Sequence, residues 1–104
     1  MGEGGRRVVT RNVNYARGGG RRIARELYDA VKRAILNSVP RDGEGILFRD
    51  LSRAVSGRVP KALLRGRSVS WYTTTVKLDL EARGMIQRLP GRTPQRLRRT
   101  GRGR

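Results

Sequence analysis

The sequence contains no cysteine and no histidine. Without cysteine the chain can form neither a disulfide framework nor a thiolate metal site. Without histidine it lacks the commonest zinc ligand and the usual general base at neutral pH, and it can assemble no Ser-His or Cys-His nucleophile. The carboxylate pairs Glu26/Asp29 and Asp79/Glu81 have no such group beside them, and no Walker loop or dinucleotide fingerprint is present. The composition therefore predicts a protein that is not an enzyme and that carries no metal or cofactor.

Apolar residues are also scarce: hydrophobic types make up 36% of the 104 residues, and only five residues are aromatic. No apolar run reaches the roughly 18 residues that span a membrane, and the N-terminal MGEGGRR lacks the apolar core of a signal peptide. The chain is therefore expected to be cytoplasmic and to have no membrane partner. The apolar residues recur in periodic segments, which favours one small folded domain over disorder. We place this domain at residues 23–99, between a flexible basic arm at 1–22 and a flexible basic tail at 100–104.

Acidic residues are few, at 8 against 25 Lys and Arg, so the formal net charge is +17. Residues 1–22 carry six Arg and one Glu, and residues 88–104 carry seven Arg and no acid, so the two ends hold +12 of this charge. Such ends attract polyanions and speed association with them, without by themselves reading a sequence. The alternative is a solvated surface that reflects a GC-rich genome, and the ratio of 22 Arg to 3 Lys fits both interpretations.

The first part of the domain is predicted to form a helix and a short strand. Apolar residues recur at spacings of three and four from Ile23 to Ile35, which predicts a helix over residues 21–37. The turn residues PRDG at 40–43 end it. The brief apolar run at 46–48 can then add an edge strand.

Two more helices are predicted after this strand, with a turn between them. Apolar spacing predicts a second helix over 48–57, and Pro60 can open a single helical turn. The third helix is capped by Ser68 or Ser70 and ends at Gly84. This helix is apolar on two sides, so both sides must be packed. Only the narrow polar strip between them, which holds Ser70, Thr74, Lys77 and Glu81, is expected to face a ligand.

The last part of the domain is predicted to be a hairpin. Residues 85–89 and 95–99 can pair across the loop PGRTP, with Leu97 turned inward. Three helices followed by a hairpin predict an α+β fold, a winged helix-turn-helix in which the hairpin is the wing. The segment LEARGMI, from Leu80 to Ile86, resembles the junction between the third helix and the wing that is common in winged-helix proteins.

A closer resemblance is carried by Tyr28, the PRDG turn, the pair Trp71-Tyr72 and the pattern VxLDLEAxG at 76–84. In these features, over residues 12–97, the chain resembles a family of small bacterial domains of unknown function with a winged-helix-like fold. The resemblance implies this fold and no activity, because the family has none assigned. The chain departs from the family at ARGGG (16–20), where the family has Pro-Gly near the start of the first helix.

The candidate nucleic-acid-binding residues lie at the start of the third helix, on its polar strip and on the wing. Arginines at the helix start flank backbone N–H groups that can bind phosphate, and the polar strip has the residue types that touch base edges. The wing arginines suit a phosphate clamp or a minor-groove probe. An ordinary solvated surface is the alternative, since Asp79 and Glu81 would repel phosphate. In chain order the candidates are Arg65, Arg67, Ser70, Thr74, Lys77, Arg88, Arg92, Arg96, Arg98 and Arg99.

Trp71 and Tyr72 can stack on unpaired bases, but they lie on opposite apolar sides of the third helix. Core packing is therefore the favoured role for at least one of them.

These features predict a nucleic-acid-binding protein with duplex DNA as the favoured partner, in a transcription-regulator-like or nucleoid-associated role. RNA or ribosome association is a second hypothesis, because the same charge serves structured RNA. A third is a non-catalytic adaptor that docks an acidic protein. The sequence leaves the oligomeric state open.

Overall fold

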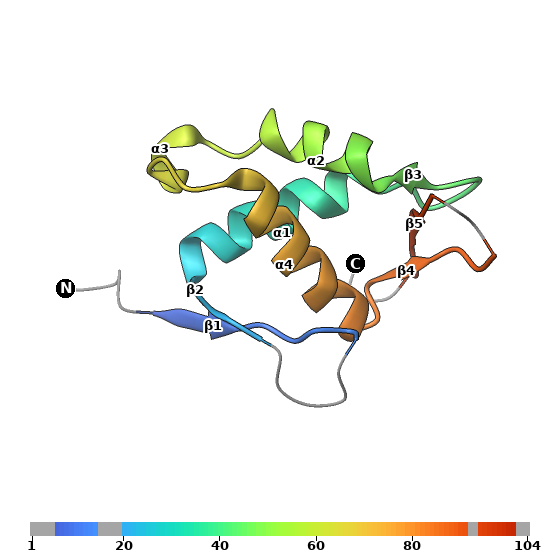
Figure 1. Ribbon diagram of the computed structural model, residues 1–104, viewed down its shortest axis with the longest axis horizontal. Helices are drawn as coiled ribbons and strands as arrows, with labels where there is room; N and C mark the ends of the chain where they lie inside the picture. Colours follow the sequence, from blue (N-terminus) through green and yellow to red (C-terminus); the bar gives the residue numbers. More distant parts are fainter. Residues whose placement is uncertain (1–5, 15–19, 92–93, 102–104) are drawn as a thin grey trace.

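The computed structural model describes residues 6–14, 20–91 and 94–101. Over these ranges the chain is a small mixed α+β domain with four helices and two antiparallel sheets (Figure 1), which confirms the predicted α+β class. Within the same ranges no helix has the length and apolar character needed to cross a membrane. The elements in chain order are β1 (Arg7–Val9), β2 (Arg22–Ala24), α1 (Arg25–Ser38), β3 (Ile46–Leu47), α2 (Phe48–Ser56), α3 (Lys61–Leu64), α4 (Val69–Ala82), β4 (Ile86–Arg88) and β5 (Arg96–Arg99).

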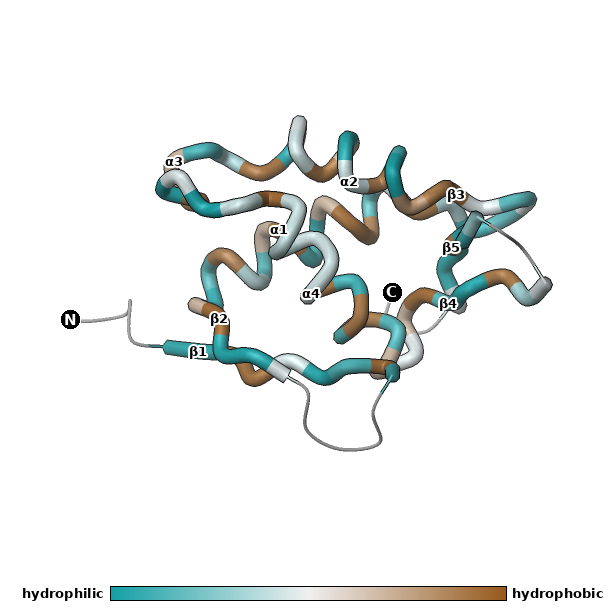
Figure 2. The backbone as a smooth tube through the Cα atoms, viewed as in Figure 1, coloured by the Kyte–Doolittle hydropathy of each residue, from teal (hydrophilic) through white to brown (hydrophobic). Residues whose placement is uncertain are grey.

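Helices α1, α2 and α4 contact one another and enclose the core. The apolar stripe of α1 is buried as its spacing predicts: Leu27, Val31 and Ile35 are at most 2% exposed. In Figure 2 hydrophobic residues recur along α1 and α2 between polar ones. The predicted start of the first helix at residue 21 is wrong, because residues 22–24 are extended and pair with β1, so α1 begins only at Arg25.

The second helix and the turn after it match their predictions. α2 ends at Ser56 with Gly57 as its C-cap, and α3 is a single turn that begins after Pro60. Arg65 ends α3 in the left-handed conformation with φ of 51°, and Gly66 follows with φ of 80°.

The predicted edge strand and hairpin form one sheet with the order β3-β5-β4. Leu97 on β5 pairs with both Ile46 and Arg88 and is fully buried, which confirms its predicted inward position. Gly45 permits this pairing: its φ is 75°, and a Cβ at this position would lie 2.3 Å from the carbonyl oxygen of Leu97. Thr100 continues the hydrogen bonding, since its N–H donates to Met85 O at 3.1 Å, so the predicted tail boundary at 100 falls inside this pairing.

The N-terminal segment is part of the packed domain. β1 pairs with β2 in the register Val8 to Ile23, and both side chains are buried, at 8% and 2% exposure. The predicted domain boundary before residue 23 therefore falls inside a strand. The rest of the predicted arm and tail, residues 1–5, 15–19 and 102–104, lies outside the described residues.

Gly20 allows the N-terminal segment to approach the start of β2 closely. A Cβ at Gly20 would lie 1.8 Å from the carbonyl oxygen of Thr10, so only glycine lets the two segments approach this closely. The neighbouring Arg21 N–H donates to Thr10 Oγ1 at 2.8 Å, and the Thr10 N–H donates to Arg21 O at 2.9 Å. The pairing of the N-terminal segment therefore extends beyond β1.

The burial pattern of β1 gives a matched test of this packing. Val8→Ala removes buried methyl groups and should lower the free energy of unfolding by about 2 kcal/mol. Val9→Ala, on the neighbouring side chain that is 62% exposed, should change it by less than about 0.5 kcal/mol. Urea denaturation measures both. Equal, negligible effects would show that the N-terminal strand does not pack on the core.

Candidate nucleic-acid interface

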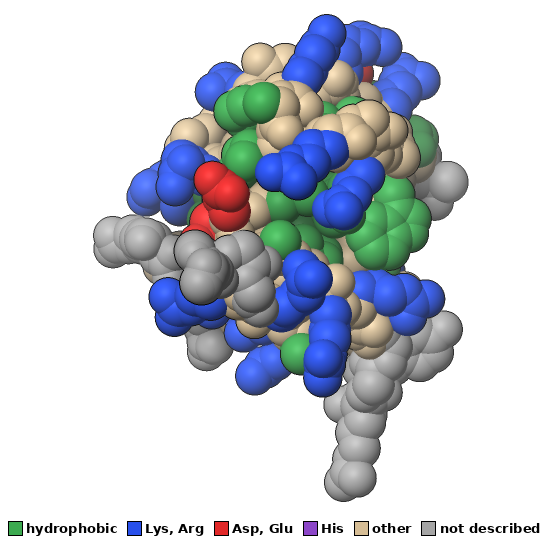
Figure 3. All heavy atoms as spheres, turned by 90° about the vertical axis from the view of Figure 1, so that its left-hand side faces the viewer, with side chains coloured by type: hydrophobic (Ala, Val, Ile, Leu, Met, Phe, Trp, Pro, Cys, Tyr) green, Lys and Arg blue, Asp and Glu red, His purple; other side chains and the backbone are tan. Residues whose placement is uncertain are grey.

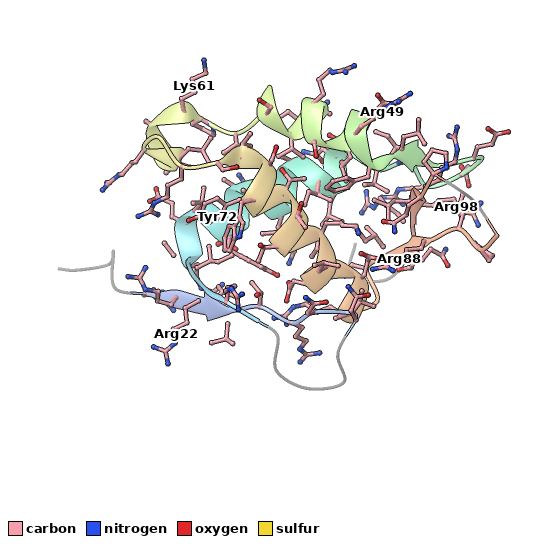
Figure 4. All side chains as sticks on the ribbon, viewed as in Figure 1. Arg22, Arg49, Lys61, Tyr72, Arg88 and Arg98 are labelled. Carbon is pink, nitrogen blue, oxygen red and sulfur yellow. The ribbon has the colours of Figure 1, made fainter. Side chains whose placement is uncertain are left out.

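Exposed cations concentrate at the end of the molecule formed by β1, β2, α3 and the turn before α4, which we name the basic end. Figure 3 views this end and shows Lys and Arg side chains around a smaller hydrophobic area. Figure 4 labels Arg22 and Lys61, which lie on opposite edges of it. Arg25 pairs with Asp29 at 3.9 Å, and no carboxylate within the described ranges pairs with the others. The exposed cations of the basic end are Arg6, Arg7, Arg22, Arg25, Lys61, Arg65 and Arg67.

The first two turns of α4 are open to solvent beside this end. Ser68 caps the helix, since its Oγ accepts a hydrogen bond from the Trp71 N–H at 3.1 Å, which agrees with one of the two predicted caps. Ser70 and Thr74 are exposed on the outer surface of the helix, where the polar strip was predicted. These two candidate residues are therefore accessible to a ligand.

Lys77 does not share this surface, and its predicted exposure on the polar strip is wrong. Its side chain is 7% exposed, and its ammonium lies 2.9 Å from Oε2 of Glu81, as an ion pair rather than a well-directed hydrogen bond. The ammonium also lies 5.3 Å from the centre of the Phe48 ring. Because Phe48 at the start of α2 and the Glu81 carboxylate enclose this ammonium, Lys77 has a structural role in the free protein.

Glu81, the other end of the predicted strip, is also buried. Its Oε1 accepts a hydrogen bond from Nε of Arg88 on β4, and Nη2 of Arg88 donates to Asn14 Oδ1 at 3.4 Å. β4 and the N-terminal segment therefore cover the last turns of α4. This leaves the first two turns as its accessible part.

Trp71 and Tyr72 differ in their surroundings. Trp71 is 44% exposed, whereas Tyr72 is half-buried and packs against the core, so core packing holds for Tyr72 and not for Trp71. Their rings are 4.9 Å apart in an edge-to-face arrangement. Trp71 also lines a small hollow of about 100 Å³ together with Arg11 and Arg21. An exposed indole beside two guanidinium groups is a surface that can contact bases or sugars.

Arg65 and Arg67 lie where they were predicted, in the turn before α4, and both are exposed. They line one pocket together with Arg7 of β1. Nη1 of Arg67 is 3.5 Å from the Tyr72 hydroxyl, which is at the outer limit of a hydrogen bond.

Three arginines of the predicted wing form hydrogen bonds with other parts of the domain, which the hairpin pattern does not predict. Nη1 of Arg98 donates to Gly43 O at 3.0 Å, and Nη1 of Arg99 donates to Leu36 O at 3.3 Å. Arg88 pairs with Glu81, as described above. Arg96 is half-buried, and no partner of its guanidinium is found in the described part of the chain. Arg92 lies outside the described residues.

Asp79 organises a buried polar network that the sequence pattern does not predict. Its carboxylate is inaccessible to solvent and accepts a hydrogen bond from the Tyr28 hydroxyl of α1. Nε of Arg83 lies 2.8 Å from one carboxylate oxygen and 2.9 Å from the other and donates to both. The carboxylate also accepts a hydrogen bond from the backbone N–H of Arg11, at 2.8 Å. The carboxylate thus joins the N-terminal segment to α1 and α4.

The network shifts two pKa values. Burial, reinforced by the hydrogen bond to Asp79 and by its charge, raises the pKa of Tyr28 well above its usual range. Burial alone would lower the pKa of Arg83, but the hydrogen bond and charge of Asp79 outweigh it and raise this pKa. Tyr28 therefore stays neutral and Arg83 stays charged across the physiological range.

The described residues contain no group of three or more His, Cys, Asp or Glu side chains that could hold a metal ion. The fold and the surface of the described residues define a small α+β domain with a basic end. The chain belongs to a family of unknown function (DUF6958), which matches residues 7–97. This match includes β1, in agreement with the packing of the N-terminal segment. Comparisons with curated proteins and with solved structures gave no significant match.

The raised pKa of Tyr28 predicts a loss of stability in alkali. Above about pH 10 a tyrosine in the unfolded chain loses its proton while folded Tyr28 keeps it, so the folded state binds more protons and stability falls as pH rises. The contribution of Tyr28 to the free energy of unfolding then falls by up to about 1.4 kcal/mol per pH unit. Tyr28→Phe should remove this contribution, so the stability difference between the two proteins should shrink from pH 9 to pH 11. Urea denaturation measures this difference, and a constant one would contradict the arrangement around Asp79.

Proposed function

We propose that the protein binds nucleic acid, with duplex DNA as its preferred partner, through the first two turns of α4 and the basic end. One observation is the main support for this proposal. Exposed arginines that have no carboxylate partner in the described ranges lie beside an exposed surface of α4 that contains Ser70, Trp71 and Thr74. Elsewhere on α4, Lys77 and Arg83 are neutralised by acids of the same helix. Among the cations on and next to α4, those without a carboxylate partner in the described ranges are thus on the side where the helix is open.

This arrangement supports contact with a phosphate backbone. Each guanidinium that replaces a counterion on DNA contributes to affinity, and arginine can bind phosphate oxygens in a bidentate manner. Arg65 and Arg67 lie before the helix, and Arg11 and Arg21 lie beside Trp71. A ligand placed on the first two turns of α4 therefore meets guanidinium groups on two sides.

The order of elements supports the finer interpretation that the domain is a winged helix. From α1 onward, a helix, a strand, a second helix, the single-turn α3, a further helix and a hairpin follow one another, and the sheet order is β3-β5-β4. We propose that α4 is the recognition helix and the β4–β5 hairpin the wing. Base contact then comes from Ser70, Trp71 and Thr74, because the later turns of α4 are covered.

One observation favours a second candidate, RNA or another partner with unpaired bases. An indole that is 44% exposed can stack on an unpaired base, which duplex DNA does not present. An acidic protein is the remaining candidate and rests on charge alone.

Competition among partners tests the proposal. Binding of duplex DNA, single-stranded DNA and structured RNA of equal length should be measured at several salt concentrations. We expect duplex DNA to bind most tightly. A plot of the logarithm of its affinity against the logarithm of salt concentration should fall with a slope of about 0.9 per phosphate contact. A preference for structured RNA or single strands would support the second candidate. No binding at low salt would refute nucleic-acid binding.

A charge substitution on α4 locates the interface. Thr74→Glu places a carboxylate on the open surface and should weaken duplex binding by at least about tenfold, through repulsion of phosphate. Asn37→Glu is the matched control, because it changes net charge equally at an exposed position of α1 that lines a separate groove with Arg99. The control should change affinity by less than about threefold, as expected for a change in overall charge alone. Equal effects of the two substitutions would show that α4 is not the contact surface.

A further inference from the structure

A pocket of about 250 Å³ opens at the basic end, between β1, the start of α1 and the turn before α4. Leu27 and Leu63 supply apolar lining, and Arg7, Arg65, Arg67 and Glu26 supply charged side chains. Arg7 comes from β1, whereas Arg65 and Arg67 come from the turn before α4, so the fold brings two distant segments together at this pocket.

The charges of this pocket do not balance. Three guanidinium groups and one carboxylate leave a formal charge of +2. Glu26 forms no ion pair with any of the three arginines, and no described residue pairs with Arg7 or Arg65. Like charges in one pocket repel one another, and an oxyanion placed among them would offset that repulsion.

The backbone fixes two of these arginines at the pocket. Arg65 has the left-handed conformation, with φ of 51°, and it is the one residue other than glycine with positive φ within the described ranges. Gly66 continues with φ of 80°, and Arg67 follows. This tight turn lets both arginine side chains line the same pocket although only one residue separates them.

The size of the pocket limits its ligand. Clefts that hold drug-sized molecules have volumes of about 300–1,000 Å³, and this pocket is smaller. Arginine recognises phosphate through parallel N–H donors, and a phosphomonoester carries a charge of about −1.5 to −2 at pH 7. The volume therefore argues against a drug-sized ligand and leaves room for a phosphate group, and the formal charge suits one phosphate.

We propose that this pocket is a binding site for a single phosphate group, supplied by a nucleic-acid backbone or by a free phosphate or phosphomonoester. The nucleic-acid source rests on the proposed function, whereas the free source does not.

Two measurements on four proteins separate these cases. The proteins are the wild type, Arg65→Gln, Arg67→Gln and the control Arg41→Gln, which removes an exposed arginine from the turn after α1, outside the pocket. The first measurement is the rise in melting temperature when chloride is replaced by inorganic phosphate at about 20 mM and equal ionic strength. The second is the salt dependence of duplex DNA binding. Circular dichroism in chloride verifies that each variant is folded. The two pocket variants provide two independent tests of the same site.

We expect phosphate to raise the melting temperature of the wild type and of Arg41→Gln by about 3 °C more than that of either pocket variant. The comparison among proteins removes the general stabilisation by phosphate salts, which all four share. The magnitude of the log–log salt slope for duplex binding is the second readout. If this magnitude is smaller by about 0.9 in the pocket variants than in the control, the nucleic-acid backbone occupies the pocket. If their slope equals that of the control, the site is one for free phosphate.

An equal rise in all four proteins would overturn the phosphate site, whatever the DNA measurement gives. Failure of the wild type to bind any nucleic acid would instead refute the proposed function, and the melting measurement would still decide the pocket.

Discussion

The structure depends on the buried carboxylate of Asp79. A charge with no solvent access is costly unless it is paired and hydrogen-bonded, and Asp79 meets this requirement with groups from three parts of the chain. The Arg83 guanidinium neutralises it, the Tyr28 hydroxyl ties α4 to α1, and the Arg11 N–H ties α4 to the N-terminal segment. Removing one partner would leave the others with an unsatisfied buried charge, so the three segments are energetically coupled.

This coupling determines which surface of α4 is accessible. The segment that Asp79 holds continues to Asn14, whose side chain meets Arg88 beside the buried Glu81. The later turns of α4 are therefore covered, and Lys77 is enclosed with Phe48. The first two turns stay open, next to Arg65 and Arg67, which pair with no acid in the described part of the chain. The electrostatic contrast between these halves of one helix is the physical basis of the proposed interface.

The spacing of apolar residues within each segment was sufficient to predict most helices and strands of this fold. The features that it did not predict, such as the buried polar side chains of α4, arise from contacts between segments far apart in the sequence. The spacing of Leu27, Val31 and Ile35 predicted α1, and the alternation around Leu97 predicted β5, because each signal lies within one segment. The burial of Lys77 and Glu81 arises from Phe48 and Arg88, and the role of Asp79 arises from Arg11, 68 residues away. A helical wheel shows none of these partners. The acids at 79 and 81 on a helix otherwise crowded with apolar residues were the available signal.

The central claim is that Asp79 holds the N-terminal segment on α4 and so confines the accessible surface to the first two turns. Amide hydrogen exchange, resolved to single residues in the free protein and with saturating duplex DNA, tests this claim most directly. The account predicts that the Arg11 amide is protected in both states and that new protection on DNA addition appears around residues 65–75. Rapid exchange at Arg11 in the free protein would contradict it, as would loss of that protection on DNA binding with new protection at residues 77–82.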